Sequence, residues 1–113
     1  MQHSLQMMMQ LVADGIYSKE QVIEKMCHAP AKLFGVKQRG FIRKGYFADL
    51  VLVNPNKSYT VTKDNILYKC GWSPLEGETL SSNIQTTILN GKVVFHNGEV
   101  VGKPNGQALE FVR

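Results

Sequence analysis

The sequence lacks most of the side-chain patterns that bind metal ions or perform catalysis. Its 113 residues include only two cysteines, Cys27 and Cys70, and without a Cys-x-x-Cys pair a zinc knuckle or a thioredoxin-like motif is excluded. The three histidines, His3, His28 and His96, are widely spaced, so the chain has no His-x-His or His-Glu-x-x-His ligand pair. A Gly-x-Ser-x-Gly elbow, a P-loop and a dinucleotide-binding fingerprint are also absent. We therefore assign no catalytic, cofactor-binding or metal-binding residue from the sequence.

Long apolar runs and dense charge are missing as well. Without a stretch of about 18 apolar residues we expect no membrane-spanning helix, and the first residues lack the basic region of a secretory signal. The net charge of +4 comes from scattered residues, and the group around Arg39, Arg43 and Lys44 resembles a solvated basic loop more than a nucleic-acid motif. We predict a cytoplasmic protein with no nucleic-acid or membrane partner. Cys27 and Cys70 are expected to be half-buried thiols, although a disulfide between them stays open.

The first 39 residues carry helix patterns. In the first helix apolar residues recur at i, i+3, i+4 and i+7, at Leu5, Met8, Met9 and Val12. Asp14-Gly15 is expected to end this helix. The capping-box pattern at 18–21 predicts a second helix, and residues 29–35 predict a short third one with Pro30 in its first turn and Gly35 at its end.

The first helix is apolar around much of its circumference, because Met7 and Leu11 widen the stripe. Apolar patches of this kind are rarely left exposed on soluble monomers. The β-domain, a second copy or aggregation would have to cover this patch, and a second copy is favoured because symmetric dimers are the commonest closed oligomers. We therefore predict a possible homodimer through the first helix.

From Gly40 onward the pattern changes to strands, expected at 47–53, 58–62 and 84–95. The apolar run 50–53 suggests a strand covered on both faces, with Asp49 bonding to nearby backbone N–H groups. Asn90-Gly91 between apolar runs predicts a two-residue hairpin turn, and Asn97-Gly98 a second turn. Helices followed by strands indicate the α+β class.

The histidines have ordinary structural interpretations. His28 is expected to cap a helix end or interact with its dipole, and His96 to be an exposed turn residue beside Asn97-Gly98. His3 could approach a site above a barrel strand, although a structural role is favoured. Among the carboxylates, Glu20 and Glu24 share one helical face, and we expect that face to be solvated.

Four segments together resemble the metal-dependent amidohydrolases, and dihydroorotases in particular. The first, 40–53, has the pattern Gly-x-Ile-x-x-Gly-x-x-Ala-Asp-Leu-Val, and 25–35 is similar to the family's barrel-exit Pro-Ala-x-Leu-Phe-Gly motif. Residues 70–77 resemble the Ser/Thr-Pro-Phe-x-Gly segment of dihydroorotases, with Leu75 in place of phenylalanine. The fourth, 84–94, is similar to the family's closing hairpin.

The resemblance implies that residues 1–39 are the last helices of a (β/α)₈ barrel and that 40–113 are the C-terminal part of a small β-sandwich domain. The parent would be a TIM-barrel enzyme that uses zinc to interconvert dihydroorotate and N-carbamoyl-aspartate. Its metal ligands, which are histidines, a carboxylated lysine and an aspartate, cannot be placed on this sequence. The chain therefore resembles a C-terminal fragment that is inactive alone and contains no zinc.

Three other interpretations stay open. The fragment could belong to another cyclic amidohydrolase, of the hydantoinase, dihydropyrimidinase or allantoinase type. A free-standing α+β binding or scaffold module, and a nucleic-acid binder, would require that the family resemblance is misleading. An upstream His-x-His on an early strand would favour the enzymes.

Overall fold

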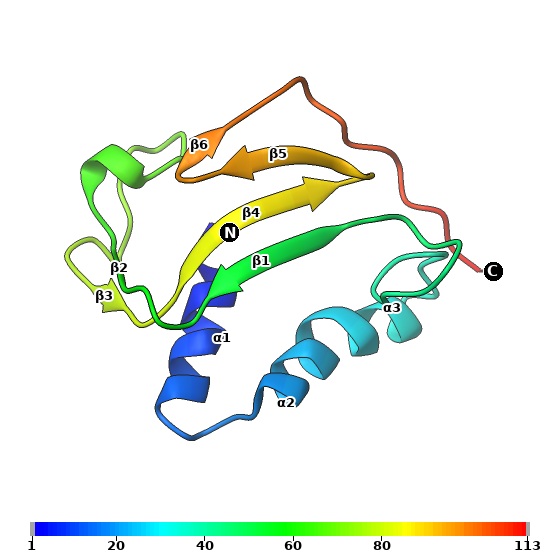
Figure 1. Ribbon diagram of the computed structural model, residues 1–113, viewed down its shortest axis with the longest axis horizontal. Helices are drawn as coiled ribbons and strands as arrows, with labels where there is room; N and C mark the ends of the chain where they lie inside the picture. Colours follow the sequence, from blue (N-terminus) through cyan, green and yellow to red (C-terminus); the bar gives the residue numbers. More distant parts are fainter. Residues whose placement is uncertain (1, 113) are drawn as a thin grey trace.

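The computed structural model describes residues 2–112 and shows helices packed against one face of an antiparallel sheet (Figure 1). The helical segments are α1 (Ser4–Ala13), α2 (Lys19–Ile23), the π-helical η1 (Glu24–His28), α3 (Ala29–Leu33) and the 3₁₀ turn η2 (Lys63–Asn65). The strands are β1 (Leu50–Asn54), β2 (Tyr59–Thr60), β3 (Thr79–Leu80), β4 (Asn83–Leu89), β5 (Lys92–His96) and β6 (Glu99–Val100). The predicted α+β class is confirmed. The assignment of these parts to a barrel and a sandwich, divided at residue 39, stays a prediction.

Helix α1 ends where the sequence predicts. Gly15 has a φ of 75°, which glycine adopts without a side-chain clash. The Gly15 N–H donates to the Val12 carbonyl and the Ile16 N–H to the Leu11 carbonyl, so the helix closes with a Schellman motif. The predicted capping box is also present, since Ser18 Oγ accepts from the Gln21 N–H at 3.1 Å and Gln21 Oε1 from the Ser18 N–H at 2.8 Å.

The predicted second and third helices are present as α2 and α3, with Pro30 in the first turn of α3, but η1 joins them into one segment without a break. Ile23 and His28, at the two junctions, both keep right-handed helical angles. Pro30 would normally disrupt a helix interior because it lacks an N–H and crowds the preceding turn. The wider π-helical turn η1 lies directly before α3 and changes the hydrogen-bond spacing ahead of Pro30. Gly35 ends the segment with a φ of 62°.

The main sheet has the order β1-β4-β5-β6, with every pair antiparallel, and β2 and β3 form a separate two-stranded pair. Both predicted turns are confirmed: φ is 50° and 79° at Asn90 and Gly91, and 47° and 88° at Asn97 and Gly98. Positive φ at both central positions gives the turn type whose twist matches a hairpin. These two turns place β5 between β4 and β6.

The expectation that β1 is covered on both faces is wrong. Val51 and Leu52 point to opposite faces, and their exposed fractions are 40% and 52%. Only β4 pairs with β1 among residues 2–112, so β1 is an edge strand of this sheet. A continuous apolar run favours two-sided cover, but the helices lie on one side of the sheet only (Figure 1).

The buried apolar core is small. The apolar side chains below a tenth exposed are Val22, Ala31, Val61 and Leu80. Val61 is fully buried between exposed threonines, the alternation that a half-buried strand has within the predicted range 58–62. Large apolar residues stay exposed on many elements, for example Leu33 at 78% and Trp72 at 60%. Much of the apolar surface of these residues therefore has no partner within the described chain.

A partly buried polar cluster joins the loop after α3 to the start of β1 and to the turn between β4 and β5. Arg39, with a side chain only 10% exposed, forms an ion pair with Asp49 and donates a hydrogen bond of 2.9 Å to Asn90 Oδ1. Asp49 Oδ1 accepts from the Asn90 backbone N–H at 2.8 Å. The expected local partners of Asp49 are thus replaced by a residue 41 positions away, and Arg39 is not part of a solvated loop. Both corrections arise because the fold brings opposite charges together in a poorly hydrated place.

Replacing Gly91 with Val should destabilise the protein by about 1–3 kcal/mol, because a β-branched residue would be forced to positive φ. A Cβ at Gly91 would meet no atom within 4 Å, so the cost is one of backbone conformation and not of crowding. Gly106→Val is the matched control, since Gly106 is equally open and lacks a positive φ. Chemical denaturation measures both, and equal midpoints for the two variants would contradict the turn.

Candidate functional site

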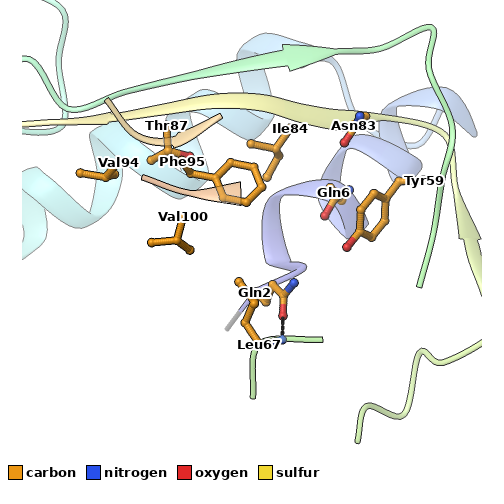
Figure 2. A pocket seen from close by; sticks show the side chains of 10 residues that line it. All are labelled: Gln2, Gln6, Tyr59, Leu67, Asn83, Ile84, Thr87, Val94, Phe95 and Val100. Atoms are coloured by element: carbon orange, nitrogen blue, oxygen red, sulfur yellow. Dashed lines mark hydrogen bonds between the residues drawn. The ribbon is translucent and has the colours of Figure 1, made fainter. Parts of the chain in front are cut away.

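A cavity of about 350 Å³ lies between α1, the segment 59–67 and the sheet (Figure 2). Its apolar wall comes from β4, β5 and β6 and includes Ile84, Phe95 and Val100. Thr87, Phe95 and Val100 are directly opposite one another in the strand register, so they share the sheet face turned toward the cavity. A concave apolar surface with a few polar groups is the usual form of a small-molecule site.

The polar wall of the cavity depends on a stripe of glutamines along α1, which the sequence patterns above do not detect. Gln6 and Gln10 are four residues apart and therefore lie on one face of α1, and Gln2, just before the N-cap residue His3, continues the same spacing. Gln6 Nε2 donates to the Ser82 carbonyl at 3.2 Å, and Gln10 Oε1 accepts from the Ser81 N–H at 2.9 Å. The i, i+4, i+8 spacing of the three glutamines is the signal that could have identified this face.

Gln2 fixes the opposite side of the cavity. Its Nε2 donates to the Asn65 carbonyl at 2.6 Å and its Oε1 accepts from the Leu67 N–H at 2.8 Å, the contact drawn in Figure 2. A single side-chain amide thereby holds the segment after η2 against the start of α1. Because the nitrogen and the oxygen of its side-chain amide are both hydrogen-bonded, Gln2 is a positioning residue for this wall.

His3 lies beside this cavity but is not among the residues that line it. Its side chain is 1% exposed, and its ring centroid is 5.8 Å from that of Tyr59 and 6.0 Å from that of Tyr68. Nδ1 is 3.4 Å from the Tyr68 hydroxyl, and Nε2 has no hydrogen-bond partner within residues 2–112. Burial lowers the pKa of His3, because the charged imidazolium would lose its hydration.

The other two histidines correct the sequence-based expectations in part. His28 is inside a continuous helical segment, not at a helix end: Nδ1 is 3.0 Å from a Glu24 oxygen, and its ring stacks on Phe41 at 4.3 Å. The ion pair with Glu24 lowers the pKa of that carboxyl. His96 is exposed as expected, but it ends β5 and its Nδ1 is 2.9 Å from Thr86 Oγ1 across the strands.

The groups around the cavity can form hydrogen bonds, but they do not form an acid–base or nucleophile pair. The polar lining consists of the amides of Gln2, Gln6 and Asn83, the Thr87 hydroxyl and the Tyr59 phenol. The pKa of Tyr59 is raised mainly by burial. Within residues 2–112 no group of three or more His, Cys, Asp or Glu side chains could hold a metal ion. The donor sets available in the described chain therefore do not fit a catalytic zinc site.

Cys27 and Cys70 are exposed and free, so the expected half-buried state is wrong for both. Cys27 also lines a second, apolar cavity of about 420 Å³ between the helices and β1. Leu5 and Met9 of α1 face Val51 and Val53 of β1 across this space. The apolar stripe of α1 thus lies on a different side from its glutamine stripe.

A helical segment, a one-sided antiparallel sheet and a polar cluster at the hairpin turn together describe an α+β unit. The amidohydrolase family matches residues 1–94, and the chain belongs to this family. The matched range therefore includes every helix described here and most of the main sheet, through β4 and into β5.

Several relatives are dihydroorotases. The chain is 34% identical to the dihydroorotase of Pyrococcus furiosus over 91% of its own length, and that match covers 25% of the relative. It is 42% identical over 65 residues to an allantoinase of Escherichia coli. The chain therefore spans about a quarter of the length of the dihydroorotases that it matches.

Solved hydantoinases share the fold. An L-hydantoinase (dihydropyrimidinase) from Arthrobacter aurescens superposes with a TM-score of 0.79 at 35% identity, covering 88% of this chain and 23% of that one. A D-hydantoinase superposes with a TM-score of 0.80 at 32% identity and a similar coverage. Relatives with three different names thus match this chain, two of them in sequence and the hydantoinases in fold, and a cyclic amidohydrolase is the class that they have in common.

Acidification should destabilise the protein through His3. The folded-state pKa is lowered, so the unfolded chain binds more protons at intermediate pH, and the free energy of unfolding decreases as pH falls below about 6.5. The stability is present above that value and is lost progressively toward the lower folded-state pKa. Urea denaturation between about pH 7.5 and 5.5, above the range of the carboxylates, measures it.

His3→Phe isolates this effect, because phenylalanine fills a similar space without titrating. The difference in stability between the two proteins should change with pH in favour of the variant on acidification. A pH-independent difference would contradict a neutral, buried His3.

Proposed function

We propose that this chain is the C-terminal part of a dihydroorotase, a zinc hydrolase that interconverts dihydroorotate and N-carbamoyl-aspartate. The observation that carries this proposal is the 34% identity to a dihydroorotase over 91% of the chain. The Ser-Pro-x-Glu-Gly segment at 73–77 supports it, since it resembles the corresponding segment of dihydroorotases. In this segment Ser73 is buried and its Oγ accepts from the Leu75 N–H at 3.2 Å, a side-chain-to-backbone bond that shapes the turn.

The role of this part is structural in the proposal. Helices 4–33 would belong to the wall of the barrel, and the strands to the small β-domain beside it. The exposed apolar side chains on α3 and β1, including Leu33 and Leu52, would then pack against the rest of the enzyme. Zinc and its ligands would belong to other parts of the enzyme.

A second candidate is another cyclic amidohydrolase. The 42% identity to an allantoinase favours it over 65 residues, and the two hydantoinase structures favour it over most of the chain. A longer polypeptide that contains this segment separates the candidates, by its turnover of dihydroorotate, allantoin and hydantoin. Hydrolysis of allantoin or hydantoin without turnover of dihydroorotate would replace the first proposal with the second.

The remaining attributes follow from the proposal. The partner would be a small-molecule substrate, the compartment the cytoplasm, and neither nucleic acid nor membrane would be bound. Among residues 2–112, no helix combines the length and apolar character needed to cross a bilayer. The chain alone would be inactive and would have no cofactor of its own.

The 113-residue chain should show no dihydroorotate turnover and should not retain zinc after dialysis, since tetrahedral zinc needs three or more converging protein ligands. Elemental analysis and a product assay measure the two properties. The full-length Pyrococcus furiosus dihydroorotase is the positive control. Stoichiometric zinc or measurable turnover by the short chain would contradict the prediction.

The short chain should also form a homodimer through α1. Met7 is 46% exposed, and an apolar helical face of this kind needs cover in water. Met7→Lys should shift the mass measured by light scattering from two copies toward one. Ile42→Lys is the matched control, because Ile42 is 88% exposed but lies in the loop before β1. If the unsubstituted 113-residue chain is a monomer, or if both variants change the measured mass equally, an interface on α1 is excluded.

A further inference from the structure

Three Asn-Gly pairs occur in the chain, at 90–91, 97–98 and 105–106. At such a pair the glycine backbone nitrogen can attack the asparagine side-chain carbonyl carbon. A C–N bond forms, the amide nitrogen leaves as ammonia with the proton of the backbone N–H, and a succinimide ring remains. Water then opens the ring to aspartate or isoaspartate. The missing side chain of glycine leaves this attack unhindered.

At Asn90 the fold engages every group that this reaction uses. Arg39 donates to Oδ1 at 2.9 Å, and the amide nitrogen Nδ2 donates to the Asn105 carbonyl at 2.6 Å. The attacking nitrogen of Gly91 is engaged as well, because its N–H donates to the Ala48 carbonyl at 3.0 Å. For the ring to close, the Gly91 N–H must leave the Ala48 carbonyl, and the Asn90 side chain must turn from the position in which Asn105 and Arg39 hold it.

At Asn97 the same turn lacks these restraints. The backbone begins from nearly the same geometry, with φ of 47° and 88° compared with 50° and 79° at the first pair. The exposed Asn97 side chain has one contact within residues 2–112, between Nδ2 and His96 Nε2 at 3.1 Å, and the Gly98 N–H donates to no acceptor there. The two turns therefore differ in hydrogen bonding and hardly at all in backbone conformation.

The third pair is intermediate. Asn105 is half-buried, and its Nδ2 donates to the Leu89 carbonyl at 2.7 Å. The Gly106 N–H makes no hydrogen bond within the described chain. One of the groups that react is thus held, as at Asn97 and compared with three at the first pair, but Asn105 is half-buried whereas Asn97 is exposed.

We propose that Asn97 is a site of spontaneous deamidation in the folded protein. We propose also that the hydrogen bonds to Arg39, Asn105 and Ala48 protect Asn90 from the same reaction. The modification has a structural consequence. Isoaspartate lengthens the main chain by one carbon in the turn that holds β6, and Val100 of β6 pairs with Phe95 on the wall of the first cavity. Deamidation at Asn97 would therefore loosen this wall, independently of the proposed enzymatic function.

The test is incubation of the native chain at mildly alkaline pH and physiological temperature, followed by proteolysis and mass spectrometry of the three peptides. We expect Asn97 to deamidate at least about tenfold faster than Asn90, because each hydrogen bond at Asn90 that must break raises the barrier. Asn105 should have a rate between the two. Equal rates at the two turns, or a faster reaction at Asn90, would overturn the proposal.

The same measurement in denaturant supplies the control. In the unfolded chain the rates at Asn90 and Asn97 should converge, since both are followed by glycine. A rate difference that persists in denaturant would assign it to the local sequence and not to the fold, which also overturns the proposal. Asn97→Gly keeps a residue suited to positive φ and removes the reacting amide, so its melting temperature should not decline during incubation as that of the parent chain does.

Discussion

The ion pair between Arg39 and Asp49 is the interaction on which the arrangement of the two halves depends. Arg39 follows the helical segment, Asp49 precedes β1, and both bond to Asn90 in the turn between β4 and β5. A buried charge pair is stable only when its remaining hydrogen-bonding groups are satisfied. The Asn90 side chain and backbone N–H supply two of those bonds. These hydrogen bonds and the ion pair therefore link the helical segment, the edge strand β1 and the β4–β5 hairpin.

Gly40 lies next to this point and shows how closely the halves approach. A Cβ at this position would be 2.4 Å from the Ala31 Cβ and 2.8 Å from the Cys27 carbonyl oxygen, so only glycine fits against the helix. Its φ of 80° is a second reason for glycine. The first glycine of the family-like segment 40–53 is thus explained by packing against the helix, and its aspartate by the ion pair.

The large share of exposed apolar surface agrees with a chain that covers about a quarter of its dihydroorotase relatives. A one-sided sheet with an unpaired apolar edge is a typical site for pairing with another chain or segment. The hairpin turn, by contrast, is satisfied internally. The polar groups at the hairpin turn therefore have their partners within the chain, whereas many apolar side chains at the edge of the sheet do not.

The sequence by itself determined the elements whose signals are local. The glycine at the end of α1, the Ser18 capping box and the two Asn-Gly turns follow from backbone angles and bonds within a few residues. The α+β order and the family resemblance also follow from patterns along the chain. Tertiary structure alone decided that Asp49 pairs with Arg39, that His3 and Gln6 are more buried than the apolar stripe of α1, and that Pro30 lies within a continuous helical segment. These outcomes depend on which residues, distant in the sequence, lie together away from water, and the spacing of residues along one sequence does not encode that.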